Sequence, residues 1–316
     1  MEDVKLNYTG KIQEVTIGTG PKAITIGGEN CLSFHKFEGK IPHTPVISFQ
    51  VYDTDKIDWP DACKEPFRDV ISDPVAWAKK CVEEYGAKLL TIQLASTDPN
   101  GENRSATDAM KIVEKLVNSL DIPLIFWGVD DTKKDSETLK LIAELCSGKN
   151  VALGPVTDKN YKQIGAAAIA YKHVVIASSP IDVNLAKQLN ILLLELGVHE
   201  NQIIMDPTTG ALGYGIEYTY SVMERDRIAA LLQQDDKLGF PMICNLANEV
   251  WKTKEARISE EQFPTMGKTK DRGICLEAIT ATLLVLAGAD ILIMRHPESI
   301  KLVSELIEEL LGENIS

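Results

Sequence analysis

The sequence predicts a (β/α)8 barrel, the TIM-barrel fold, preceded by a short N-terminal β-hairpin extension. Three observations predict this fold. The chain has 316 residues, which fits one barrel of about 250 residues plus an extension. From residue 46 onward, eight apolar, β-rich runs recur, and amphipathic helix-like stretches separate them. Each run is continuous rather than alternating, as is typical of parallel strands buried on both faces.

The expected strands are the apolar runs themselves: Val46–Tyr52, Lys88–Ser96, Pro123–Val129, Val151–Val156, His173–Ser179, Ile203–Pro207, Pro241–Ala247 and Ala289–Arg295. Alternating strands and helices imply right-handed crossovers and a parallel sheet. Eight such units favour closure into a barrel. A doubly wound open sheet is the alternative, but that fold usually has fewer strands and often a Gly-rich first turn.

Short polar residues predict where the helices begin, and glycines predict where they end. The expected N-terminal caps are Asp73 (followed by Pro74), Ser105, Asp135, Asp158 and Asp182. The expected stops are Gly86, Gly148 and Gly197.

Residues 1–45 follow a different pattern from the barrel domain, which we place at residues 46–316. Val15–Ile17, Ile24–Ile26 and Cys31–Phe34 are short β-like pieces that Gly-rich turns separate. We expect an antiparallel hairpin, or a plug over the N-terminal mouth of the barrel. The glycines resemble a phosphate-binding loop only superficially, because no helix follows at the required spacing.

Charge and composition argue against several classes of partner. The net charge of −13 indicates an acidic surface, and no run of basic residues is longer than a pair such as Lys133 and Lys134. We therefore expect no nucleic-acid partner. The first residues lack the apolar segment of a signal peptide, and the most apolar run, 278–289, is too short to span a membrane. We therefore expect a cytoplasmic protein without a membrane partner.

The loops after the sixth and seventh strands contain the candidate site. Glycines and threonines after the sixth strand allow close backbone approach and supply hydroxyl and amide donors, which suits a large planar ligand with amides on its edge. A flexible turn is the alternative. The candidate cofactor-binding residues are Thr208, Thr209, Gly210, Tyr214, Gly215, Asn245 and Asn248. The two asparagines could hydrogen-bond a heterocycle or simply cap the local turn.

The sequence offers no clear catalytic residue. His296 follows the eighth strand, where it fits a helix start as well as acid–base catalysis. The six cysteines are scattered without a CxxC pair, which argues against a metal site or an iron–sulfur cluster held by this chain and favours buried thiols. A metal-dependent aldolase or hydrolase built on Asp53, Asp98 and Asp130 is a further hypothesis.

Two segments carry a family resemblance. The stretches MDPTTGALGYGIEYTYSVMERDRIAAL (205–231) and MICNLANEVWKTKEA (242–256) resemble the small (delta) subunit of the corrinoid iron–sulfur protein of the acetyl-CoA decarbonylase/synthase system. The pieces QLASTDPNG, FWGVDD and ALGPVT look like the same family, so the similarity runs over nearly the whole chain.

The resemblance implies a TIM barrel that forms a heterodimer with a large subunit. In that family the large subunit holds a 4Fe–4S cluster and carries the cobamide (corrinoid), and the small barrel covers the corrinoid with its C-terminal rim. The resemblance also implies a non-catalytic, methyl-carrying role. A separate methyltransferase delivers the methyl group of methyltetrahydrofolate, and acetyl-CoA synthase receives it in the reductive acetyl-CoA pathway.

A more distant likeness to pterin-binding methyltransferase barrels supplies the alternative, a stand-alone pterin-dependent methyltransferase. Asp206 and Asn245 fall where such barrels place polar groups near the pterin. However, Gly128-Val129 and Leu153-Gly154-Pro155 offer no amide side chain where a pterin pocket needs one. Aromatic residues near the two loops are candidates for a partner surface. They are Tyr214, Tyr218, Tyr220 and Trp251.

Overall fold

The computed structural model describes residues 5–210 and 212–312, and it confirms the predicted TIM barrel. Eight parallel strands close in the order β10-β3-β4-β5-β6-β7-β8-β9. The barrel strands are β3 Val46–Tyr52, β4 Leu90–Gln93, β5 Leu124–Trp127, β6 Ala152–Val156, β7 Val174–Ser178, β8 Ile203–Asp206, β9 Met242–Cys244 and β10 Ala289–Met294. Each lies inside one of the predicted runs.

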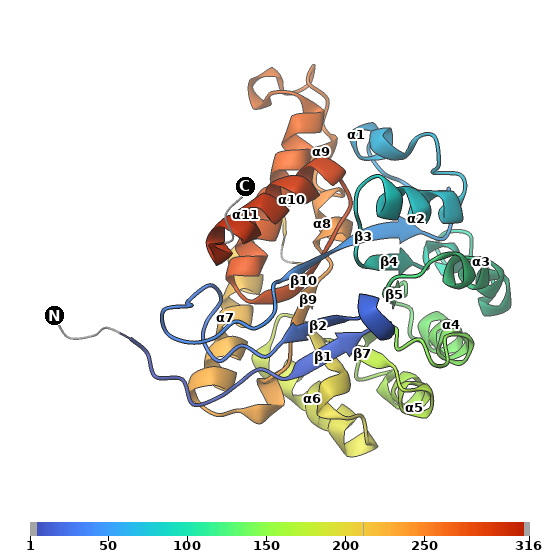
Figure 1. Cartoon of the computed structure of the whole chain (residues 1–316). Coiled ribbons are helices and arrows are strands. Elements are labelled where there is room, and N and C mark those ends of the chain that lie inside the picture. The colour runs from blue at the N-terminus through green and yellow to red at the C-terminus, as the bar shows by residue number, and fades with distance from the viewer. Residues whose placement is uncertain (1–4, 211, 313–316) are drawn as a thin grey trace.

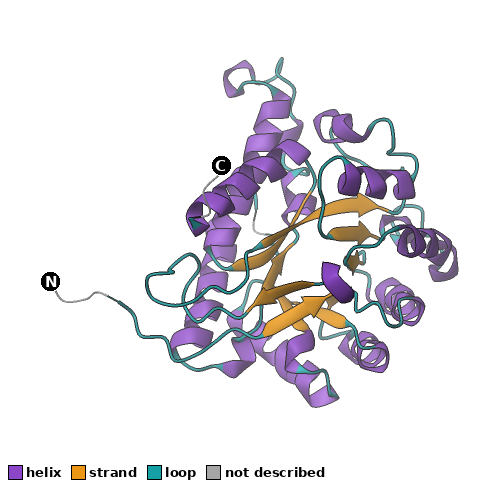
Figure 2. Cartoon of the chain, in the orientation of Figure 1, coloured by secondary structure: helices purple, strands orange, loops and turns teal. Residues whose placement is uncertain are grey.

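Helices surround the strands on the outside of the barrel (Figure 2). They are α1 Asp61–Lys64, α2 Pro74–Glu83, α3 Ala106–Ser119, α4 Thr132–Leu145, α5 Tyr161–Tyr171, α6 Val183–Leu196, α7 Ile216–Leu232, α8 Leu246–Val250, α9 Lys254–Arg257, α10 Thr269–Leu286 and α11 Pro297–Leu311. Among the described residues, no helix is both long enough and apolar enough to cross a membrane.

The N-terminal extension forms the predicted hairpin, β1 (Glu14–Ile17) paired antiparallel with β2 (Ile24–Gly27). The hairpin lies against the barrel strands (Figure 1). Val15, Ile17 and Ile26 are buried in one apolar cluster with side chains of the barrel strands. The Gly18 amide donates to the carbonyl of Asn150, which lies two residues before β6, so the hairpin closes the N-terminal mouth. The C-terminal mouth is left as the open end.

A buried ion-pair cluster fastens the extension to the barrel. Arg227 on α7 is 2% exposed, and its Nη2 lies 2.6 Å from Asp290 Oδ2 and 3.1 Å from Glu29 Oε1. Asp290 begins β10, and Glu29 belongs to the extension. Burial and the neighbouring Asp290 carboxylate together raise the pKa of Glu29 to about 7. Three distant parts of the chain therefore share one buried charge cluster.

Some local predictions are wrong, each for a visible reason. Cys31–Phe34 is not a strand, since Phe34 has a φ of 62°, in the left-handed region. Asp135 does not cap α4, because Asp131 accepts the first amides while buried Asp135 accepts from the Val129 amide. Asp158 does not cap α5, which begins after Asn160. The caps Asp73, Ser105 and Asp182 and the stop at Gly197 are confirmed.

Two further expectations need correction. Leu246 and Ala247 belong to helix α8 rather than to the seventh barrel strand, which ends at Cys244. Five cysteines are buried as expected, but Cys275 on α10 is exposed.

We predict that Arg227→Met lowers the free energy of unfolding by about 3–5 kcal/mol, because it leaves the carboxyl groups of Asp290 and Glu29 buried without their cation. Urea unfolding followed by circular dichroism measures this loss. Arg225→Met, at an exposed position on the same helix, is the matched control. Equal stability of the two variants would contradict the role given to the cluster.

Candidate functional site

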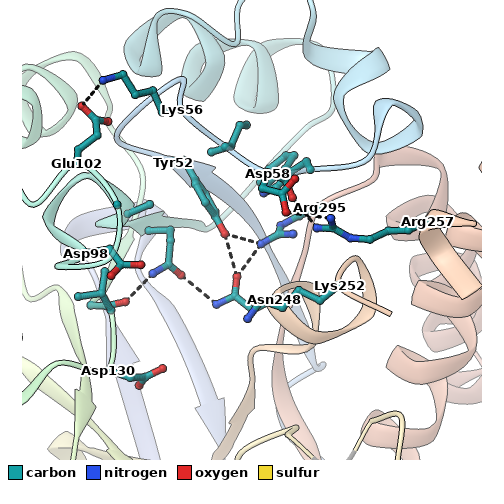
Figure 3. A pocket seen from close by; sticks show the side chains of 17 residues that line it. Tyr52, Lys56, Asp58, Asp98, Glu102, Asp130, Asn248, Lys252, Arg257 and Arg295 are labelled. Carbon is teal, nitrogen blue, oxygen red and sulfur yellow. Dashed lines mark hydrogen bonds and ion pairs between the residues drawn. The ribbon is translucent and has the colours of Figure 1, made fainter. Parts of the chain in front are cut away.

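A cavity of about 510 Å³ opens at the C-terminal mouth of the barrel (Figure 3). Strand ends and the loops that follow them supply its wall. Tyr52 ends β3, Gln93 ends β4, Gly128 follows β5, and Arg295 follows β10. Asn248 reaches the cavity from α8, the short helix after β9. The open end of the barrel therefore has the size and position of a small-molecule site.

Arg295 is the central cation of this wall. It is 2% exposed, and its guanidinium carbon lies 4.2 Å from the centroid of the Trp59 ring and 5.2 Å from that of Tyr52. Nε donates to Gln50 Oε1 at 2.7 Å, and Nη2 donates to Tyr52 Oη at 2.7 Å and Asn248 Oδ1 at 2.6 Å. Two aromatic rings and three neutral acceptors therefore hold the buried charge.

The acceptors around Arg295 belong to a network of amide side chains that joins β3, β4 and α8. Gln50 Nε2 donates to Gln93 Oε1 and to Asn248 Oδ1, both at 3.1 Å. Asn248 Nδ2 donates to Gln93 Oε1 at 3.2 Å, and Tyr52 donates its hydroxyl proton to Asn248 at 3.2 Å. Figure 3 shows Arg295, Tyr52 and Asn248 pointing toward one another. The network fixes the guanidinium in place.

Acidic side chains occupy other parts of the cavity wall. Asp58 pairs with Arg257 at 2.9 Å, and Glu102 pairs with Arg104 at 2.8 Å. The Asp130 carboxylate makes no hydrogen bond or ion pair with the described residues, and burial raises its pKa. A Cβ on Gly128 would collide with the Asp135 carboxylate, which would then have to move. This wall therefore contains both neutralised and unneutralised charges.

The loop after β8 lies on the same end of the barrel but outside the cavity wall. Asp206 anchors its start by accepting the Ser178 hydroxyl at 2.8 Å and the Thr208 amide at 3.0 Å. The Thr209 hydroxyl donates to the Asn245 carbonyl at 3.0 Å, which ties the loop to α8. Beyond this anchor the loop is open. A Cβ on Gly210 would meet nothing within 4 Å, and Tyr214 is 92% exposed.

The predicted site residues therefore fall into two groups. Asn248 lines the cavity, and Asn245 lies beneath it with its amide nitrogen buried and unpaired among the described residues. Thr208, Thr209, Gly210, Tyr214 and Gly215 form the neighbouring loop. Gly215, with a φ of 154°, directly precedes α7. Ala211 lies outside the described residues. The cavity and the loop are joined through Thr209 and α8.

Sequence reasoning missed Tyr52, Gln93 and Arg295, which line the cavity, and Gln50, which accepts a hydrogen bond from Arg295. Gln50 and Gln93 are polar side chains inside predicted apolar strands, and these two glutamines are the sequence feature that could have indicated the polar site. A glutamine side chain in a strand that is buried on both faces needs hydrogen-bond partners, so its presence indicates a buried polar network. Arg295 ends an apolar run, and the run itself gives no sign of a role at the mouth.

Two of the aromatic residues proposed for a partner surface pack against the core. Trp251 is fully buried, and Tyr220 packs partly buried against the core. Tyr214 and Tyr218 remain exposed, at 92% and 60%. His296 caps α11, since its Nδ1 accepts a hydrogen bond from the Glu298 amide. Of the two roles considered for His296, this is the helix start.

The hypothesised carboxylate triad does not come together as a metal site. Asp53 is buried and accepts both the amide and the hydroxyl of Ser96. Asp98 accepts the Asn100 amide. Within residues 5–210 and 212–312, no group of three or more His, Cys, Asp or Glu side chains could hold a metal ion.

These features define a class of protein. It is a TIM barrel whose N-terminal mouth is closed by a hairpin and whose C-terminal mouth has a polar cavity and a loop with an exposed tyrosine. The family model for the CO dehydrogenase/acetyl-CoA synthase delta subunit matches residues 14–310. The chain belongs to this family.

Relatives agree with the family model. The chain is 36% identical to the acetyl-CoA decarbonylase/synthase complex subunit delta of Archaeoglobus fulgidus, over 99% of this chain and 71% of the relative. It is 37% identical to the subunit delta of Methanothermobacter thermautotrophicus, over 97% of this chain and 78% of the relative.

Solved structures support the fold. A dihydropteroate synthase from Xanthomonas albilineans superimposes with a TM-score of 0.61 at 13% identity, covering 96% of this chain and all of that one (100%). The enzyme from Thermus thermophilus gives a TM-score of 0.56 at 16% identity, covering 95% and 100%. At these identities the likeness concerns the barrel fold alone.

We predict that Asp206→Asn flattens part of the pH dependence of stability. Burial raises the pKa of Asp206 to about 7, above its usual value, so the folded state favours the protonated carboxyl. Its contribution to stability is therefore present at low pH and lost as the pH rises through about 7. Relative to the Asn variant, the wild type should lose stability between about pH 4, near the usual pKa of an aspartate, and about pH 7.

Urea unfolding of both proteins at the two pH values measures this difference. Asp121→Asn, which removes an exposed carboxylate, controls for the loss of a charge. A stability difference between wild type and Asp206→Asn that stays constant with pH would show that Asp206 does not titrate in this range.

Proposed function

We propose that this chain is the small subunit of a corrinoid iron–sulfur protein and that it covers the cobamide of a larger subunit with the C-terminal mouth of its barrel. The observation that carries the proposal is the open loop 208–215, with Tyr214 92% exposed beside the mouth. The name of the relatives, subunit delta of an acetyl-CoA decarbonylase/synthase complex, supports a role inside an assembly.

The residues of the mouth fit such a cofactor chemically. A corrin is a large planar ring whose edge carries amides, and it needs donors, acceptors and flat apolar surface. The loop supplies the Tyr214 ring and space next to Gly210 and Gly213, where a Cβ would meet nothing within 4 Å. Asn248 and Tyr52 supply polar groups at the adjoining cavity. Both kinds of surface face the same end of the barrel.

In this proposal the chemistry of methyl transfer is supplied by the cobalt of the partner's cobamide. The chain's own residues bind and orient. Tyr214 and Tyr218 pack against the partner, while the loop backbone shields the reactive face from water. The methyl group would come from methyltetrahydrofolate through a separate methyltransferase and would pass to acetyl-CoA synthase. The 4Fe–4S cluster would belong to the large subunit, and the heterodimer would work in the cytoplasm.

The geometry gives less support to a stand-alone pterin-dependent methyltransferase. The Asp206 carboxylate already accepts from Ser178 and Thr208, so both of its oxygens are engaged within the chain. Asn245 is 6% exposed and does not line the cavity. Pterin recognition by this pair would require these contacts to rearrange.

We predict that Tyr214→Ala weakens binding to the cobamide-loaded large subunit by at least about tenfold, as expected for an exposed aromatic anchor at an interface. Because the side chain is exposed, the stability of the isolated chain should be unchanged. Titration calorimetry with the purified large subunit measures the affinity, and the visible spectrum of the cobamide reports whether the chain changes its environment.

Phe37→Ala is the matched control, since Phe37 is 63% exposed but lies in the N-terminal extension. It should bind like the wild type. The proposal fails if Tyr214→Ala binds as tightly as Phe37→Ala, or if a tight complex forms without any change in the cobamide spectrum.

A further inference from the structure

The chain contains two deeply buried arginines that differ in how their charge is balanced. Arg227 and Arg295 are both 2% exposed. Arg227 has two carboxylates within 3.1 Å, those of Asp290 and Glu29. Arg295 forms no ion pair with any described residue, and neutral oxygens and ring faces surround it instead. A buried cation without a counter-charge is costly, so its retention here needs a reason.

Two of the five N–H donors of Arg295 have no acceptor among the described residues. A guanidinium has five N–H donors. The single Nε proton goes to Gln50, and the two Nη2 protons go to Tyr52 and Asn248. Nη1 donates to no described residue. Arg295 lies in the wall of the open cavity of about 510 Å³. The wall therefore presents a fixed positive charge with two unused donors.

The other charged residues of the cavity wall limit the charge of a ligand that Arg295 could bind. Asp98 and Asp130 also line the wall, and neither is paired with a cation at ion-pair distance (Figure 3). A multiply charged anion such as a phosphate dianion would meet these carboxylates. One carboxylate would balance the one unpaired guanidinium and match its planar donor geometry.

We propose that the cavity at the C-terminal mouth is a binding site for a small carboxylate-bearing ligand, which Arg295 receives through Nη1. Trp59, stacked on the guanidinium, forms the floor of the site beside Arg295. Gln50, Tyr52 and Asn248 position the guanidinium and do not need to touch the ligand. The inference concerns the isolated chain and is independent of the corrinoid proposal.

The test uses the full chain alone, with sodium acetate as the probe and acetamide as its neutral counterpart. Proton–nitrogen NMR of the tryptophan indoles follows binding, and Trp59→Phe assigns the Trp59 signal. We expect acetate to shift the Trp59 signal with a dissociation constant of about millimolar order, as suits so small a probe.

Arg295→Met should weaken acetate binding by at least about tenfold, because it removes the charged fork. Arg257→Met is the matched control: this arginine also lines the cavity, but Asp58 already neutralises it. Its effect should stay within about twofold. Circular dichroism checks that both variants fold. If Arg295→Met does not fold, the comparison of acetate with acetamide on the wild-type chain still tests the proposal.

Three results would overturn the proposal. Acetate could leave the Trp59 signal unmoved, Arg295→Met could bind acetate like the wild type, or acetamide could bind as tightly as acetate. None of them bears on the affinity for the large subunit, which tests the corrinoid proposal separately.

Discussion

The arrangement of the whole molecule depends on the strand that closes the barrel, β10. It pairs with β9 on one side and with β3 on the other. At its start, Asp290 neutralises Arg227 and accepts the amide of Met242 on β9. Just beyond its end, Arg295 organises the polar network of the mouth. One strand therefore fastens the N-terminal plug and positions the open site, so the geometry of the mouth follows from the closure of the barrel.

The hairpin closes one mouth of the barrel, and in the described part of the chain an open cavity lies at the other. The hairpin fills the N-terminal end with Val15, Ile17 and Ile26, and the C-terminal end keeps its amides, hydroxyls and one unpaired guanidinium. Next to that cavity stands an open loop with an exposed tyrosine. A cavity of small-molecule size next to a loop that could contact a large cofactor is consistent with a subunit whose partner holds the reactive centre.

Much of this could be predicted from the sequence, because barrel strands and helix caps are local signals. Continuous apolar runs gave the eight strands, and Asp73, Ser105 and Asp182 gave three helix starts. The family resemblance predicted in addition that the chain is a subunit of a larger complex. The cavity itself could not be predicted, since Gln50, Asn248 and Arg295 meet only through the order of the strands around the barrel. Trp251 shows the same limit: a position near a key loop does not reveal which way a side chain faces.

The central claim is that the C-terminal mouth faces a corrinoid-bearing partner, and a structure of the complex with the cobamide-loaded large subunit tests it most directly. The account predicts that Tyr214 and the loop 208–215 are buried against the partner, with the corrin lying over the mouth beside Arg295. A complex in which the large subunit binds the outer helices, leaving Tyr214 exposed and the mouth open to solvent, would contradict it.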